Sequence, residues 1–322
     1  MVSLEKIKRL IKTRLIYRYD FNNDKKYSTL LCGHYAQQEM LLSALVVNAH
    51  TIEKGLTMPN KRFPFGDVKA KIILNDCALY VKKGYDVNEP RFIDILAIMK
   101  EYCEVHTQHG ICLSAFSNKV EDLIRATANF DKSQQQYFVS REDYFKHAAD
   151  DFFAFANSRH SCRNLPGHVS EESLRKALAL SMTTPSTCNR QSHRVHILQS
   201  AESKKIILSI QGGHRGFGDI ADQFLLITSD LNCWPSGNLR NGPYVDGGIY
   251  VMNLLYSLHH EKIAACTLNM YLTNEYSRRM HEQLDIPNSE VPVALIAIGI
   301  PPEQFDLARG HRRNYEEIIR IH

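Results

Sequence analysis

The chain has 322 residues, a net charge of +4, 44% hydrophobic residues and 23% charged residues, a balance typical of a globular protein with a large core. The mild charge does not favour nucleic acid as a partner, and the longest apolar run is far too short to span a bilayer. The first residues contain no apolar signal-peptide core, so we expect a cytoplasmic protein with no membrane or nucleic-acid partner.

The first part of the chain is predicted to be mainly helical. Apolar residues recur at helical spacing in the segments 4–15, 40–54 and 92–99. The polar run Asp131–Gln136 is the best linker candidate, which gives two domains, residues 1–139 and residues 140–322. The first domain has no phosphate-binding motif, so we expect it to cover the functional site and to influence the choice of substrate.

The second part of the chain alternates between helices and strands. Ser140 is expected to cap a helix that runs from Glu142 to about Asn157, and residues 317–321 have a β-prone composition. Further helices are predicted at 171–182, 246–258 and 274–284, and strands at 194–199, 224–228, 263–268 and 291–300. This pattern indicates an α+β domain built in layers.

Metal-binding signals are weak in this chain. The eight cysteines form no C-x-x-C pair, so neither a zinc ribbon nor a thioredoxin-like site is expected. His193 and His196 have H-x-x-H spacing, but in a strand they point to opposite faces, so we predict no metal ligand there.

Three polar segments stand out in the second domain: Arg159-His160-Ser161-Cys162-Arg163, the loop Pro185–Gln191, and Arg309–Arg313 near the end. Taken singly, the basic segments are explained by a solvated face and the loop by an ordinary turn. Together they suit a phosphate-bearing planar cofactor, because guanidinium groups donate bidentately to phosphate. The amide of Asn189 can both donate to and accept from a ring edge.

The order and spacing of these segments resemble the FMN-dependent nitroreductase family. The motifs R-[RH]-S-x-[RK] and P-S-x-x-N-x-Q are followed by a basic pair ahead of a short apolar tail, over roughly residues 140–322. The resemblance implies a three-layer nitroreductase-like fold with a central, mostly antiparallel sheet, beside the extra helical domain. It also implies FMN as cofactor, NADH or NADPH as reductant, and ping-pong hydride transfer to nitro-aromatic, quinone-like or related acceptors.

The family motifs also imply which residues bind the cofactor. They are Arg159, His160, Ser161, Arg163, Pro185, Ser186, Thr187, Asn189, Gln191, Leu268, Asn269 and Arg312. Gln191 would brace the loop, residues 266–270 would bring backbone groups to the flavin, and residues 213–215 match only loosely. No catalytic side chain is required, because the cofactor carries the redox chemistry.

Family members are homodimers with the flavin at the subunit interface, so Arg159 and Asn189 of one site would come from different chains. The apolar helix after Asp246 fits such an interface. Two departures leave the substrate open: Ser192-His193 replaces a common Pro-Trp pair, and Asn314 stands where proline is common. The alternatives are a flavin-dependent tailoring enzyme of a biosynthetic pathway, or a non-catalytic flavin-binding interaction protein.

Overall fold

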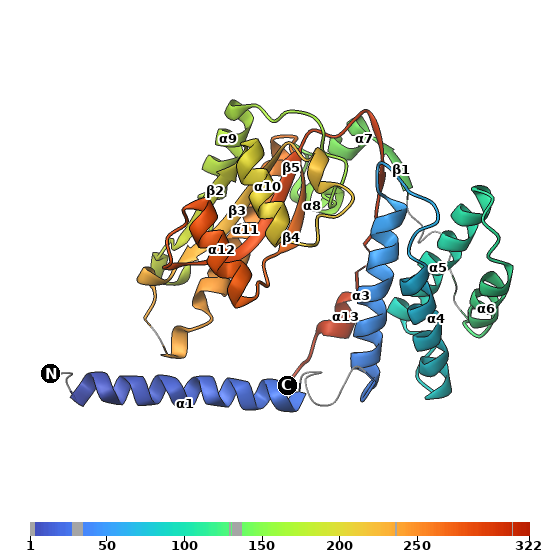
Figure 1. The fold of residues 1–322 in the computed structure, drawn as a ribbon, viewed down its shortest axis with the longest axis horizontal. Coiled ribbons are helices and arrows are strands. Elements are labelled where there is room, and N and C mark those ends of the chain that lie inside the picture. Colours follow the sequence, from blue (N-terminus) through green and yellow to red (C-terminus); the bar gives the residue numbers. More distant parts are fainter. Residues whose placement is uncertain (1–3, 28–34, 129, 131–136, 236, 311) are drawn as a thin grey trace. The chain divides into compact units, whose positions relative to one another are not determined.

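The computed structural model describes residues 4–27, 35–128, 130, 137–235, 237–310 and 312–322 (Figure 1). It divides into a sheet unit, Met1–Tyr19 with Phe138–Phe305, and a helical unit, Asp20–Tyr137 with Asp306–His322. The predicted domain boundary after residue 139 lies close to the division at Tyr137 and Phe138. The two chain ends are exchanged, however, because Met1–Tyr19 belongs to the sheet unit and Asp306–His322 to the helical unit. The predicted linker at residues 131–136 lies outside the described residues.

In its described residues the helical unit contains four long helices, namely α3 (Gln38–Leu56), α4 (Asp67–Lys82), α5 (Pro90–Gln108) and α6 (Ser114–Arg125). Helix α1 (Leu4–Tyr27) crosses the division between the units. Apolar residues at helical spacing on α3, α4 and α5 form one core, which includes Leu41, Leu45, Ile52, Ile73, Tyr80, Phe92 and Leu96. No helix in the described ranges is long and apolar enough to cross a membrane.

The C-terminal tail is held by the helical unit, and it is not the predicted β-segment. Residues Tyr315–Ile318 form the short helix α13, because Asn314 and Glu317 make a reciprocal capping box at its start. Lys61 pairs with Asp306 at 2.6 Å, and the Gly310 amide donates to Glu53 at 3.2 Å. These contacts place the tail against α3 and the segment that follows it.

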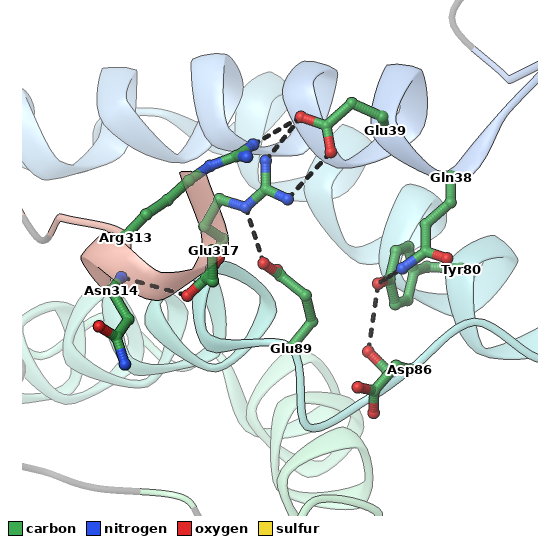
Figure 2. A network of polar contacts seen from close by, with 9 residues as sticks. Gln38, Glu39, Tyr80, Asp86, Glu89, Arg313, Asn314 and Glu317 are labelled. Atoms are coloured by element: carbon green, nitrogen blue, oxygen red, sulfur yellow. Dashed lines mark hydrogen bonds and ion pairs between the residues drawn. The ribbon is translucent and has the colours of Figure 1, made fainter. Parts of the chain in front are cut away.

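An ionic network fastens the tail to two helices of this unit (Figure 2). Glu39 accepts from Arg91 at 2.8 Å and from Arg313 at 2.6 Å, and Arg91 also donates to Glu89. The hydrogen bond from Arg91 is the main reason that the pKa of Glu39 falls to about 2. Arg313, part of the third basic segment, therefore has a structural partner.

The sheet unit is built on a four-stranded antiparallel sheet in the order β2-β3-β5-β4. The strands are β2 (His193–Leu198), β3 (Gln223–Asp230), β4 (Ala264–Asn269) and β5 (Glu290–Gly299). The two strands β1 (Tyr137–Ser140) and β6 (Gln304–Leu307) form a second sheet, and the division between the units falls within both of them. The outer strands of the main sheet are thus β2 and β4.

Both faces of the main sheet are buried, as a three-layer fold requires. Leu225, Ile227 and Ile296 share a core with α9 (Glu171–Ser181) and the long helix α11 (Gly242–His260). The alternate residues, such as Leu226 and Leu295, are also fully buried and face the other way. On that side α10 (Ala201–Ile210) packs against α12 (Asn274–Leu284) (Figure 1). The predicted α+β class with a mostly antiparallel sheet is therefore confirmed.

The helix predicted from Glu142 to Asn157 is wrong. The segment forms two short helices, α7 (Arg141–Phe145) and α8 (Phe152–Ser158). Ser140 caps α7 as predicted, but Asp151 starts a second helix because its carboxylate accepts from the amides of Phe153 and Ala154. A side-chain cap within a predicted helix favours a break at that point.

Candidate functional site

The arginine segment, Arg159–Arg163, leaves the end of α8 and is fixed beside the outer strand β4. The Cys162 amide donates to the Ala265 carbonyl at 3.0 Å, and the Tyr144 hydroxyl donates to the His160 carbonyl at 2.6 Å. Further along, a side chain at Gly299 would collide with the Leu165 backbone, so glycine permits the close approach of this segment to the sheet. The backbone of the segment is thus held by the fold itself.

The arginines of this segment have buried N–H groups without acceptors. Arg163 is only 7% exposed, and neither its Nε nor its Nη1 has a partner among the residues that the structure describes. The Nε of Arg159 is in the same situation. Since a buried cation without a counter-charge is costly, this arrangement fits a bound anion such as a phosphate group.

The end of α11 adds a neutral histidine beside the arginine segment. His259 is buried, and its Nε2 lies 2.8 Å from the hydroxyl of Ser158. Burial, with smaller contributions from Arg159 and from the neighbouring histidines, lowers the pKa of His259 to about 4. His259 therefore adds no positive charge near neutral pH, and the arginines carry it.

His259 should make stability depend on pH. Its folded pKa, about 4, lies below the ordinary value of 6.5, so the unfolded chain binds the extra proton between these two values. The contribution of His259 to the free energy of unfolding should fall by about 3 kcal/mol as the pH drops from 6.5 to 4, and should level off below 4. Urea unfolding of the wild type and of His259→Gln across this range measures the difference.

All other titrating groups are common to the two proteins, so the difference between their stabilities isolates the contribution of His259. If His259→Gln keeps the full slope of the wild type, His259 is not the group responsible.

The second element is the loop Pro185–Gln191, whose backbone conformation is unusual. Cys188, Asn189 and Gln191 have positive φ values of 52°, 56° and 49°, a region that costs residues other than glycine on the order of 1 kcal/mol or more. The Gln191 amide donates to the Ser186 hydroxyl at 3.0 Å, and the Gln191 side chain donates to Asn189 Oδ1 at 3.0 Å. The bracing role predicted for Gln191 matches this contact, which leaves the exposed Asn189 NH₂ group as a donor for a ligand.

The loop is anchored by two residues that sequence reasoning did not assign to the site. Asp246, buried on α11, accepts from the Thr187 amide and from its hydroxyl, both at 2.8 Å. Arg190 donates to the Cys233 carbonyl at 3.1 Å and lies over the ring of Trp234. Thr187, predicted as a cofactor ligand, thus directs its hydroxyl into the protein as an anchor. An acidic residue in an otherwise apolar helix was the available signal for Asp246.

The third element is the outer edge of β4. The Ala265 carbonyl accepts from Cys162, and the Asn269 carbonyl accepts from the buried Gln211 at 3.1 Å. Strand alternation therefore directs the backbone N–H and C=O groups of Thr267 to this same edge. The backbone groups of the buried Leu268 point instead to the neighbouring strand β5. Leu268 and Asn269 were both predicted to bind the cofactor. Of the two, only Asn269 directs its backbone carbonyl to the outer edge, as Thr267 does.

Beside this edge, Gln211 also accepts from the Gly213 amide at 2.7 Å. The side chain of Gln211 therefore joins the end of β4 to the turn at Gly213, the segment that matched the family motifs only loosely.

Two predicted elements lie far apart within the sheet unit. The arginine segment contacts β4 and directly follows Ser158, which bonds His259 at the C-terminal end of α11, whereas the loop contacts Asp246 near the N-terminal end of α11 and leads into β2. Asp246 and His259 are about 20 Å apart at about 1.5 Å per helical residue. The strands β2 and β4 are the two opposite edges of the sheet. One chain therefore does not bring Arg163 and Asn189 to the same point.

Arg312, the predicted third phosphate ligand, belongs to the helical unit, where it donates to the Gly310 carbonyl. In the same segment Arg309 lies over the ring of Tyr137. The predicted convergence of Arg312 with Arg159 and Arg163 stays a prediction. No group of three or more potential metal ligands occurs among the residues that the structure describes.

No family model and no curated protein matches this chain. Solved structures similar to it include nitroreductase-family proteins from Clostridium difficile 630 (20% identity, TM-score 0.45) and Streptococcus pneumoniae TIGR4 (16%, 0.46). Another is a protein from Exiguobacterium sibiricum 255-15 assigned as a nitroreductase, in complex with FMN (17%, 0.47). Each match covers 53–54% of this chain and 97–100% of the other chain.

Proposed function

We propose that this protein is an FMN-dependent oxidoreductase that uses NADH or NADPH to reduce small electron acceptors of the nitro-aromatic or quinone class. The observation that carries the proposal is the pair of arginines with buried, unpaired N–H groups, Arg159 and Arg163, at the start of the nitroreductase-like motif. A phosphate would satisfy these donors, and such charge-assisted bonds contribute on the order of 1.5–3 kcal/mol each.

Different residues of the site would bind different parts of the cofactor. Arg159, Arg163 and Ser161 would hold the phosphate, and the amide of Asn189 would donate to the ring edge. The outer edge of β4, with Gln211 beside it, would align backbone groups along the ring. When bound, FMN supplies the redox chemistry by taking a hydride from the reductant and passing it to the acceptor. The side chains would hold the cofactor in position and exclude water, so no catalytic residue is assigned.

We infer that the working form is a homodimer, and an apolar stripe on α11 supports this. Val245, Ile249 and Met252 lie on one side of the helix and are 58%, 44% and 36% exposed. Exposed Phe152 of α8 packs its ring against Tyr256 of the same helix and extends the apolar surface. Contiguous apolar surface of this kind is typical of subunit interfaces.

A twofold axis through this stripe would pair two α11 helices in antiparallel orientation. Such pairing brings the N-terminal end of one α11, with its loop Pro185–Gln191, to the C-terminal end of the other, with its arginine segment. It would therefore unite the two elements that one chain holds at opposite ends of α11. Two features thus support the same assembly. One is the exposed apolar stripe on α11, and the other is the separation of Arg163 and Asn189 within one chain.

A flavin spectrum tests the proposed function directly. We expect the purified protein to be yellow, to show flavin absorption bands in a 1:1 ratio to the chain, and to bleach when NADH or NADPH is added without oxygen. The released cofactor should be FMN when it is separated from the denatured protein. A colourless protein that binds no added FMN would refute the proposal, and a flavin that neither nucleotide bleaches would refute the assigned reductants.

A further inference from the structure

The helical unit contains a groove that the proposed flavin chemistry does not use. It lies between α4 and α6 and has a volume of about 730 Å³. Its floor is apolar and includes Leu74, Phe116 and Leu123. The groove stays open because the residues along its sides are small, namely Ala78, Ala115 and Ala126. A concave, mainly apolar site of this size is typical of small-molecule binding.

The two helices that line the groove run parallel. Helix α6 is antiparallel to α5, because Lys100 in the middle of α5 pairs with Glu121 at 2.8 Å and the Ala128 amide after α6 donates to Asn88 just before α5. Asn88 follows the end of α4 by a short turn. Helices α4 and α6 therefore end on the same side, and their first turns lie together at the other end of the groove.

The two lysines of the lining lie in the half of the groove where both helices begin. Lys119 lines the groove and has no acceptor among the described residues, and Lys71, also in the lining, pairs with Asp67 at 2.9 Å. The acidic residue of the lining, Asp122, is paired with Arg125. Two positive helix N-termini add to the field at this end. The other half of the groove presents Val81, Leu123 and Ala126, together with Asp122 in its pair with Arg125.

We propose that this groove binds an elongated apolar molecule with one anionic head group, such as a long-chain carboxylate, whose head lies at Lys119. The lined segments of the two helices are about 15 Å long. A helical peptide of this length, about 10 Å wide, would occupy about 1,200 Å³, which exceeds the groove. Among the described lining residues, Lys119 presents the one ammonium group without a partner, which matches one anionic head, and the mainly apolar half matches the chain.

Titration calorimetry of the full-length protein with dodecanoate, below its micelle concentration, tests the proposal. We expect one molecule bound per chain, and binding of the uncharged dodecanol about tenfold weaker because it lacks the contact with Lys119. No binding of dodecanoate, or equal binding of dodecanol, overturns the proposal. Binding of an acidic helical peptide, with no binding of dodecanoate, also overturns it.

Variants locate the ligand in the groove. Ala78→Trp fills the groove from an exposed position and should abolish binding, and Ala126→Trp serves as a second filling variant if the first protein fails to fold. Lys119→Glu should weaken dodecanoate binding about tenfold or more. The control Lys82→Glu changes an exposed lysine of α4 outside the lining and should bind as the wild type does. Wild-type affinity in a folded filling variant contradicts the proposed site.

Discussion

The Arg163→Met protein should bind FMN about 100-fold more weakly than the wild type, while its FMN-free form should be at least as stable. Arg163 is buried, and two of its nitrogens have no acceptor. Removal of the two bonds that these nitrogens would make to phosphate should cost about 3 kcal/mol of binding free energy, which is about 100-fold in affinity. Because no described residue compensates its charge, methionine removes a desolvation cost from the FMN-free protein.

Two measurements separate a binding role of Arg163 from a structural one. Flavin fluorescence quenching gives the affinity, and urea unfolding without FMN gives the stability. The matched control is Arg175→Met, which removes an exposed arginine paired with Glu171 on α9 and should leave both values nearly unchanged. If Arg163→Met destabilises the FMN-free protein and leaves FMN affinity intact, Arg163 is a structural cation and the cofactor assignment fails.

A mixed dimer of Arg163→Met and Asn189→Ala chains should contain one normal FMN site and one site with both defects. Each parent homodimer carries one defect in both of its sites and should bind FMN poorly. The expectation rests on the proposed homodimer and on the separation of the arginine segment and the loop within one chain, at opposite ends of α11 and opposite edges of the sheet.

The mixed dimer can be isolated with a different affinity tag on each chain and titrated with FMN. Shared sites predict about one FMN per dimer at nearly wild-type affinity. A dimer of Arg163→Met chains that carry both tags is the matched control and should show no normal site. If the mixed dimer also lacks a normal site, the two elements do not act across the interface. A protein that is monomeric at the concentrations used would reject the dimer itself.

The predicted elements differ in how local their signals are. Helix α9 and strand β5 match their predicted ranges closely, because caps and apolar periodicity are encoded within a few neighbouring residues. The predicted helix after Ser140 and the predicted β-tail were wrong for a related reason. In both segments a side chain caps the backbone locally, Asp151 in the first and Asn314 in the second. Each cap overrides the average propensity of its segment.

The sequence by itself determined the α+β class, the order of the polar motifs and the residue types that suit a phosphate and a ring edge. Only the tertiary structure decided what those residues have as neighbours. Two nitrogens of Arg163 have no acceptor among the described residues, and Thr187 contacts Asp246, because packing brings together segments that are distant in the chain. Such contacts depend on how helices and strands are brought together, and no local pattern records that arrangement. For the same reason, only the structure shows that α11 separates the two halves of the proposed site.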